Sequence, residues 1–377
     1  MNSSTERVLM VLDSLGTGGT ETYALSLAGP LRARGVSLFC TGANGPLHRA
    51  FAQAGYQIHL PKTGGREPIA VRRRQAEKYY RSVMEREGIT VVHVHQTPSG
   101  LPAASAAKQL GIPVVFTLHG TYYPVEEAVQ LARLCDAVIS VSKPVQKYWA
   151  QRGIASAVIA NGVDVQLFHP ESGKQAIATE GRLPAIAPGA PVVTYVSRLA
   201  WQKASVCNML LRATKVLPGL SDLHVIVVGT GPQSHAVREL AKALNRQRGR
   251  EYIHFVGEKT DVRPYYAQSD LVVGTGRVAL EAMATGKPVL AIGNHGFFGL
   301  VTPSAYDQAW DYYFGDHASI AKPSSDLIAQ ALQRAFADRE QLRRWGEQAR
   351  EWVQEQFDIE QVSGQILAVY AACKQRS

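Results

Sequence analysis

The chain has 377 residues, of which 46% are hydrophobic and 19% charged, the composition of an ordinary globular protein long enough for two domains. Its four cysteines are widely spaced and form no CxxC pair, which argues against a zinc centre and a disulfide framework. The net charge of +9 suits an anionic partner such as a nucleotide or a phospholipid surface. Because the charge is spread over both halves of the chain, it does not indicate a nucleic-acid groove.

The sequence predicts a cytoplasmic protein. Glu6 and Arg7 precede an apolar run that stops at Asp13, which is too short for a secretory signal. No stretch of about 20 residues is apolar enough to span a bilayer.

Residues 62–81 concentrate basic side chains in a pattern typical of a helix. Two interpretations are open: the charges form a solvated helix face, or they contact an anionic acceptor or the inner face of the membrane as a peripheral attachment. The basic residues are Lys62, Arg66, Arg72, Arg73, Arg74, Lys78 and Arg81.

Short apolar runs alternate with helical patterns through the first half of the chain. Residues 8–12 predict a buried strand, and residues 21–34 predict a helix that Pro30 kinks or ends early. Such alternation is typical of a parallel sheet covered by helices on both faces. Further strands are predicted at residues 36–40, 56–60, 91–95, 114–118, 137–141 and 158–160.

Residues 170–191 are rich in Gly, Ala and Pro and have no strong period, which predicts a linker. The alternation then restarts, so a second α/β domain follows. Strands are predicted at residues 192–196, 224–228, 253–256, 271–273 and 289–292, and a helical tail at residues 324–337, 339–356 and 359–373. In open parallel sheets, ligands bind beyond the carboxyl ends of the strands.

The first strand is followed by the glycine turn GTGGTE at residues 16–21. Its glycines let a ligand approach the backbone, and the helix start behind it favours anions. The turn is not the GxGxxG fingerprint, and no acidic residue closes the second strand, so a nicotinamide dehydrogenase is disfavoured. A plain tight turn is the alternative.

Two cations follow the first strand of the second domain, in the segment VSRLAWQK at residues 196–203. Arg198 and Lys203 together can neutralise a diphosphate, the arginine as a bidentate donor and the lysine as a point charge. A surface pair is the alternative. The turn GTGP at residues 229–232 either lines the same crevice or is purely structural.

The segment GTGRVALEAMATGKP at residues 274–288 predicts a glycine-rich loop and a short helix that ends at Gly286. Glu281 lies on this helix between Leu280 and Ala282, so we expect it to be partly buried and to need a partner. That partner is either a sugar diol, such as a ribose, or another side chain of the protein.

Taken in order, these segments resemble glycosyltransferase family 4, a family of retaining enzymes with the two-domain GT-B fold. The resemblance covers nearly the whole chain, and its most specific motif is LEAMATGKPV at residues 280–289. The remaining matches are the early glycine turn, HG at 119–120, SVS at 140–142, NGVD at 161–164, SRL at 197–199 with Lys203, and GTGP at 229–232.

The resemblance implies an organisation and a donor site. Residues 1–170 become the acceptor-side Rossmann-like domain, 171–190 the linker, 191–357 the nucleotide-sugar domain, and 358–377 a helix packing back on the N-terminal domain. Arg198 and Lys203 would hold the donor diphosphate and Glu281 the ribose. The base would meet the backbone of Val256 and Gly257, and Gly229 and Gly276 would line the donor.

At the transferred sugar, the resemblance implies that Gly18 and Gly19 leave room and that His119 stands at the reacting centre. A buried structural histidine is the alternative for His119. The family usually has a second glutamate that contacts the sugar hydroxyls, and this chain has Val273 there. Arg277 and the Gly274–Gly276 amides are candidates to replace it, in which case an acidic or unusual sugar becomes conceivable.

The chain contains no Asp-x-Asp motif, so we expect a metal-independent transferase without a cofactor, with UDP favoured over GDP as the donor nucleotide. The acceptor is left open as a glycan, a lipid-linked sugar or a small molecule, to be chosen by loops around residues 64–74 and 122–127. No oligomeric state is predicted. The alternatives are a nucleotide-sugar epimerase of the same fold and an inactive sugar-nucleotide-binding protein.

Overall fold

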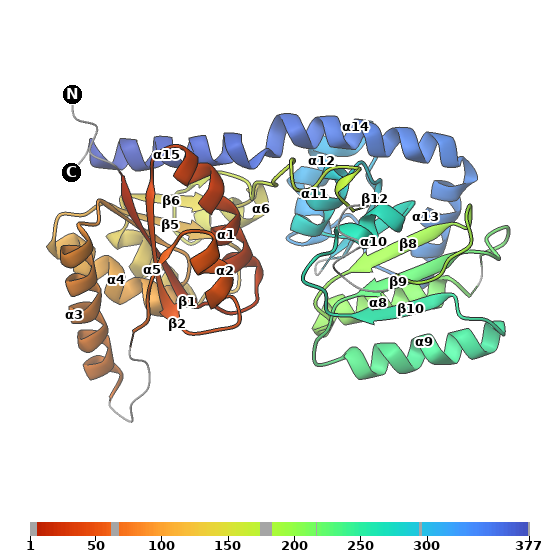
Figure 1. Cartoon of the computed structure of the whole chain (residues 1–377), viewed down its shortest axis with the longest axis horizontal. Coiled ribbons are helices and arrows are strands. Elements are labelled where there is room, and N and C mark those ends of the chain that lie inside the picture. Colours follow the sequence, from red (N-terminus) through yellow and green to blue (C-terminus); the bar gives the residue numbers. More distant parts are fainter. Residues whose placement is uncertain (1–5, 62–67, 174–182, 216, 294–295, 376–377) are drawn as a thin grey trace. The chain divides into compact units, whose positions relative to one another are not determined.

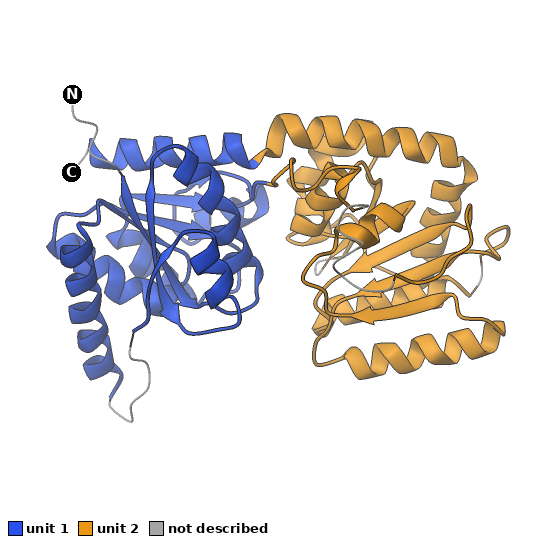
Figure 2. Cartoon of the chain, viewed as in Figure 1, with its two compact units in different colours: residues 1–162, 359–377 blue, residues 163–358 orange. Residues whose placement is uncertain are grey.

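The computed structural model describes residues 6–61, 68–173, 183–215, 217–293 and 296–375 (Figure 1). It forms two compact units. Unit 1 comprises Met1–Gly162 and Ile359–Ser377, and unit 2 comprises Val163–Asp358 (Figure 2). Residues 62–67 of the basic segment and 174–182 of the expected linker lie outside the described residues.

Unit 1 is built on a parallel sheet with the strand order β3-β2-β1-β4-β5-β6-β7. The order reverses between β1 and β4, the switch point of a doubly wound fold. The strands are β1 Arg7–Ser14, β2 Ser37–Ala43, β3 Gln57–His59, β4 Val91–Val94, β5 Val114–Leu118, β6 Ala137–Ser140 and β7 Ala157–Val158. The helices are α1 Gly19–Ala33, α2 His48–Gln53, α3 Ile69–Glu87, α4 Thr97–Gln109, α5 Val125–Leu134, α6 Lys143–Ala150 and α15 Ile359–Lys374.

Hydrophobic cores lie on both faces of this sheet. Val8 and Met10 of β1 belong to one cluster, whereas Leu9 and Val11 belong to the other, because side chains alternate along a strand. Helix α15 contributes to the first cluster through its apolar face: Val362, Ile366, Tyr370 and Cys373.

Unit 2 has the strand order β10-β9-β8-β11-β12-β13, in which only β13 is antiparallel among the described strands. The strands are β8 Val192–Val196, β9 His224–Val228, β10 Ile253–Gly257, β11 Leu271–Gly274, β12 Val289–Gly293 and β13 Gly296–Leu300. The helices are α8 Trp201–Ala213, α9 Ser234–Arg248, α10 Arg263–Gln268, α11 Gly276–Ala284, α12 Tyr306–Asp311, α13 Ser325–Ala337 and α14 Arg339–Phe357, with short 3-10 turns η1 Pro303–Ala305 and η2 Tyr313–Gly315.

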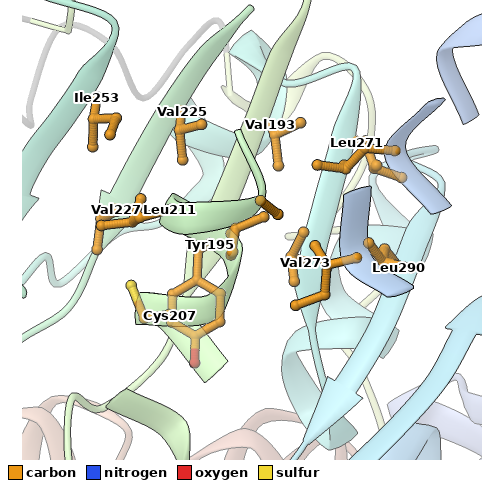
Figure 3. Packing of buried hydrophobic residues seen from close by; sticks show 14 of the residues in the cluster. Val193, Tyr195, Cys207, Leu211, Val225, Val227, Ile253, Leu271, Val273 and Leu290 are labelled. Carbon is orange, nitrogen blue, oxygen red and sulfur yellow. The ribbon is translucent and has the colours of Figure 1, made fainter. Parts of the chain in front are cut away.

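The core of unit 2 follows the same alternation. Val193 and Tyr195 of β8 face the larger cluster, together with Cys207 and Leu211 of α8 (Figure 3), whereas Val192 faces a smaller one. Both sheets confirm the predicted architecture of two Rossmann-like α/β domains with a helical C-terminus.

The structure differs from the expectations at two places. Helix α1 runs through Pro30 to Ala33, so the predicted early end is wrong. The proline sits in the last turn with its side chain buried, and packing outweighs the single hydrogen bond it removes. Strand β13, helix α12 and the turns η1 and η2 were not predicted. Across the described ranges, none of the helices combines the length and apolar composition needed to cross a membrane.

Candidate active site

The predicted phosphate-binding cations lie where β8 gives way to α8. The exposed Arg198 follows the strand, and its guanidinium makes no ion pair or hydrogen bond with the described residues. Lys203 lies in the first turn of α8, which begins at Trp201 with a left-handed φ of 42° and a side chain that is 75% exposed. The Lys203 Nζ atom lies 3.6 Å from Oδ1 of Asp316.

A glycine turn after β9 supports the loop that carries Arg198. The Leu199 amide donates to the Thr230 carbonyl at 2.8 Å, and a Cβ atom on Gly229 would overlap the carbonyl oxygen of Ser197. The Gly229 amide itself donates to the Gly257 carbonyl at 2.7 Å. These contacts account for glycine at position 229 structurally, and its direct contact with a donor stays a prediction.

Val256 and Gly257 end β10, beside the same turn. Gly257 has a left-handed φ of 77°, and a Cβ atom placed on it would meet nothing within 4 Å. No atom therefore blocks the approach of a ligand to Gly257 on that side, and the contact of this backbone with a base stays a prediction.

Helix α11 begins at Gly276, also left-handed with φ 53°. Glu281, only 8% exposed, accepts a hydrogen bond from Arg277 Nε at 2.7 Å. The expected partner of Glu281 is thus supplied by the protein. Nη1 of Arg277 is buried and has no hydrogen-bond partner among the described residues, so the pair retains a donor for a bound group.

Two further residues, Tyr266 and Val273, belong to the elements α10 and β11 that precede α11 in the chain. Burial raises the pKa of Tyr266 well above its usual range, and the charge of Glu281 adds to that effect. Val273, at the position of the missing glutamate, is fully buried in the core beside Tyr195 and Leu290 (Figure 3). Its side chain therefore cannot contact a ligand.

Asp316 was not predicted as a site residue. It directly follows the turn η2, which ends at Gly315. No local signal marks it, because its place beside Lys203 depends on contacts with residues far away in the chain.

In unit 1, His119 follows β5 and is partly exposed. Its Nε2 atom lies 3.1 Å from Nδ1 of His95, and its ring meets that of Tyr23 edge-on at 5.1 Å. The Tyr123 hydroxyl accepts from the His119 amide at 3.1 Å and donates to the His95 carbonyl at 2.9 Å. Burial lowers the pKa of His119 to about 3, so the ring is neutral at physiological pH.

Two further histidines, His93 and His95, lie in β4 and directly after it. His95 is fully buried, with its pKa well below the usual range because of burial, and it is the neighbour that orients His119. His93 is structural: its ring nitrogens bond the hydroxyls of Tyr370 and Thr117, each at 2.7 Å. The His95–His119 contact depends on the pairing of β4 with β5, which was not predicted from the sequence.

The Glu21 carboxylate lies against Gly18 in the first glycine turn. A Cβ atom on Gly18 would overlap the Glu21 carboxylate, whereas one on Gly19 would meet nothing within 4 Å. Burial raises the pKa of Glu21. That Gly18 and Gly19 leave room for a transferred sugar stays a prediction.

Unit 1 also contains a cavity of about 1040 Å³ beneath α3. Its walls combine apolar and aromatic side chains with charges of both signs. Asp13 accepts from the Ser99 amide at 3.1 Å, and Glu127 accepts from Thr97 Oγ1 at 2.8 Å. The polar lining residues among those described are Asp13, Arg72, Arg73, Gln75, Tyr79, Tyr80, Ser99 and Glu127.

Comparison with known proteins finds glycosyltransferase families and relatives. Residues 17–167 match the family model for Glycosyltransferase Family 4, and residues 182–352 match that for Glycosyl transferases group 1. The N-acetyl-alpha-D-glucosaminyl L-malate synthase of Bacillus anthracis is 24% identical over 312 residues, which are 76% of this chain and 76% of that protein.

Two further proteins are similar. The lipopolysaccharide core biosynthesis mannosyltransferase LpsB of Rhizobium meliloti is 30% identical over 252 residues, 64% of this chain and 66% of LpsB. The structure of Anabaena HepE in complex with UDP superposes with a TM-score of 0.73 at 21% identity, covering 97% of this chain and 100% of HepE, which shows the shared GT-B fold. The first model covers the N-terminal part of the chain and the second its C-terminal part, and together they identify a GT4-like glycosyltransferase.

Proposed function

We propose that this chain transfers a sugar from a UDP-sugar to an acceptor hydroxyl, with retention of configuration and without a metal ion. The observation that carries the proposal is the cationic pair Arg198 and Lys203 at the carboxyl edge of the unit 2 sheet. UDP is chosen because the similar HepE structure binds it. Within the described part of the chain, no three His, Cys, Asp or Glu side chains gather as metal ligands do.

The cations would act on the leaving group. Negative charge grows on the diphosphate as the anomeric C–O bond breaks, and fixed positive groups stabilise that state more than the ground state. Arg198 and Lys203 would bind this diphosphate. Glu281, oriented by Arg277, would accept hydrogen bonds from the ribose, and the backbone at Val256–Gly257 would contact the uracil.

His119 would position the sugar rather than transfer a proton. Because burial lowers its pKa to about 3, the ring is neutral and offers one donor and one acceptor. In the front-face reaction that we propose, the acceptor oxygen forms the new anomeric bond on the side from which the diphosphate departs. The acceptor proton goes to the leaving phosphate oxygen.

We propose that the acceptor enters the cavity beneath α3, next to the inner face of the membrane. Ile69 is 74% exposed and Val71 is 41% exposed on the first turn of the helix that carries Arg72–Arg74. Exposed apolar side chains beside basic ones suit attachment to an anionic bilayer. Arg72 and Arg73 would meet an anionic group of the acceptor, and Asp13 or Glu127 its hydroxyls.

The second candidate function is an inactive sugar-nucleotide-binding protein, favoured by the burial of Val273 where the family has a glutamate. The epimerase alternative loses support, because both matching family models describe glycosyltransferases.

The test compares Arg198→Ala and Lys203→Ala with Arg212→Ala, an exposed arginine on α8. The wild type is first titrated with UDP, GDP and ADP in a thermal-shift assay. A nucleotide at a hundred times its Kd should stabilise the protein by about 2.7 kcal/mol. Donor turnover should fall about a hundredfold or more in the two clamp variants, and not in Arg212→Ala, at unchanged melting temperature. Near-wild-type turnover of Arg198→Ala, or no response to any nucleotide, contradicts the proposal.

A further inference from the structure

The turn before Asp316 holds three successive residues in left-handed conformations. Tyr313 has φ 49°, Phe314 has φ 54° and Gly315 has φ 83°. A non-glycine residue in this region costs about 1–3 kcal/mol, and the conformation persists only where the surroundings enforce it. Two such residues in a row mean that this turn is fixed by its neighbours.

The neighbours belong to the donor side of unit 2. Thr275, the residue that precedes α11, donates its hydroxyl to the Phe314 carbonyl at 2.8 Å. A Cβ atom on Gly293, at the end of β12, would overlap the Gly315 carbonyl. Phe314 itself is fully buried. The turn is thus held between the start of α11 and the end of β12.

The consequence is the position of the Asp316 carboxylate. Its Oδ1 lies 3.6 Å from Lys203 Nζ, and its Oδ2 would lie 3.6 Å from a Cβ atom on Gly276. The Asp316 side chain is 17% exposed and that of Lys203 is 28% exposed. The carboxylate therefore lies between the proposed phosphate-binding lysine and the first residue of α11.

The Lys203–Asp316 ion pair leaves hydrogen-bond acceptor capacity on the carboxylate unused. A charge-assisted N–H···O bond is normally about 2.7–2.9 Å long, and this pair is longer. Oδ1 of Asp316 is buried and accepts no hydrogen bond from the described residues. A buried carboxylate oxygen without a donor is costly, so a site of this kind calls for a ligand that brings hydroxyl groups.

We infer that Asp316 accepts hydrogen bonds from hydroxyl groups of the donor sugar, beside the diphosphate, and so helps to select which sugar is transferred. This assignment rests on the proposed function. A carboxylate next to a diphosphate would otherwise repel it, whereas a sugar attached to that diphosphate brings hydroxyl donors to the same place. With Val273 in the core, Asp316 supplies a carboxylate from a different part of the chain.

The experiment uses the full chain and measures the Kd of UDP and of UDP-glucose, UDP-galactose and UDP-N-acetylglucosamine by calorimetry. Asp316→Asn is compared with Asp307→Asn, an exposed residue of α12. In Asp316→Asn, UDP should bind as well as or better than in the wild type, because a negative charge beside Lys203 is gone. The preferred UDP-sugar should bind about tenfold to a hundredfold more weakly, with kcat/KM reduced in parallel. Asp307→Asn should change neither.

Asp316→Glu, which keeps the charge but moves it, is the second variant in case the asparagine variant is unstable. It should leave UDP binding within about threefold and still weaken the UDP-sugar about tenfold. If the Kd values of UDP and of the UDP-sugar change equally in the variants, Asp316 is only a partner of Lys203 and the inference is overturned. The inference is also overturned if both ligands bind the variants as they bind the wild type. If the wild type binds no UDP at all, the proposed function itself fails.

Discussion

Glycine at position 229 combines a backbone conformation and a contact that no other residue satisfies. Its φ is 133°, and a Cβ atom would overlap the Ser197 carbonyl oxygen in the loop that carries Arg198. We expect Gly229→Ala to lower the free energy of unfolding by at least about 2 kcal/mol, since both strain and displacement of the loop contribute. UDP affinity should fall as well.

The control is Gly249→Ala in the same unit. Gly249 has φ 71°, but nothing lies within 4 Å of a Cβ atom there, so only the conformational cost of about 1 kcal/mol remains. Urea unfolding and UDP titration of both variants make the comparison. Equal losses of stability, or unchanged UDP affinity in Gly229→Ala, would show that the glycine does not support the Arg198 loop.

His93 makes the stability of unit 1 depend on pH. Burial lowers its pKa to about 3, whereas a histidine in the unfolded chain titrates near 6.5. Below pH 6.5 this histidine is therefore protonated in the unfolded chain, whereas it stays neutral in the folded chain. The stabilisation is complete above pH 6.5 and is lost as the pH falls towards 3, by about 1.4 kcal/mol per pH unit for each such histidine.

We predict that His93→Gln flattens this dependence by about one proton. The amide can still bond the hydroxyls of Tyr370 and Thr117, which His93 bonds at 2.7 Å, but it does not titrate. Hydrogen exchange of the β4 and β5 amides in urea, from pH 7 to pH 5, measures the slope. His235→Gln, at an exposed position, should leave it unchanged. Identical slopes for His93→Gln and the wild type would refute the assignment.

At the scale of the helices, two ion pairs share the i,i+4 spacing but differ in burial. In α11, the side chains of Arg277 and Glu281 are 18% and 11% exposed, whereas those of Arg343 and Glu347 in α14 are 67% and 57% exposed. We expect Arg277→Met to cost about 3 kcal/mol, because it leaves a buried carboxylate without its partner. Arg343→Met should cost less than about 0.5 kcal/mol.

Urea unfolding of both variants, with the double variant Arg277→Met/Glu281→Gln, separates the two effects. The double variant should recover part of the stability, since the buried charge is removed with its partner. If both single variants lose the same amount, burial does not determine the strength of these pairs.

The sequence predicted those elements whose signal is local. Strand β8 at Val192–Val196 and helix α13 at Ser325–Ala337 carry their own apolar pattern, and they lie within a residue of the predicted bounds. Helix α12 and the turn η2 do not. The turn η2 contacts Thr275 and Gly293, which no short window of sequence brings together with it.

The candidate site likewise contains residues with a local sequence signal and residues that only the tertiary structure brings together. Arg198 and Lys203 could be found because one strand end and one helix start carry both. The sequence did not decide whether Glu281 pairs with Arg277, since a carboxylate among apolar neighbours has several possible partners. Asp316 and the His95–His119 contact arise from tertiary structure, where residues from separate segments meet.

At the scale of the whole chain, the two units differ in how the sequence builds them. Unit 2 is one continuous segment, Val163–Asp358, whereas unit 1 needs the final helix α15 from Ile359 onward. The buried face of α15 packs into the same cluster as Val8 and Met10 of β1, and Tyr370 bonds His93. Removal of residues 359–377 would expose that cluster, so we expect unit 1 to lose its fold and the truncated chain to aggregate.

Unit 2 should therefore fold by itself and bind the nucleotide. All the groups proposed to hold UDP, namely Arg198, Lys203, Glu281 and the Val256–Gly257 backbone, lie within Val163–Asp358, which has its own core. We expect residues 163–358, expressed alone, to unfold cooperatively and to bind UDP with a Kd within about tenfold of the full chain, allowing about 1.4 kcal/mol for lost support. They should transfer no sugar, because His119 and the proposed acceptor cavity belong to unit 1.

Calorimetry with UDP and a donor turnover assay test this, with the fragment carrying Arg198→Ala as the matched control. A folded fragment without UDP affinity would mean that unit 1 supplies essential nucleotide contacts, and the donor site assigned to unit 2 would then be incomplete.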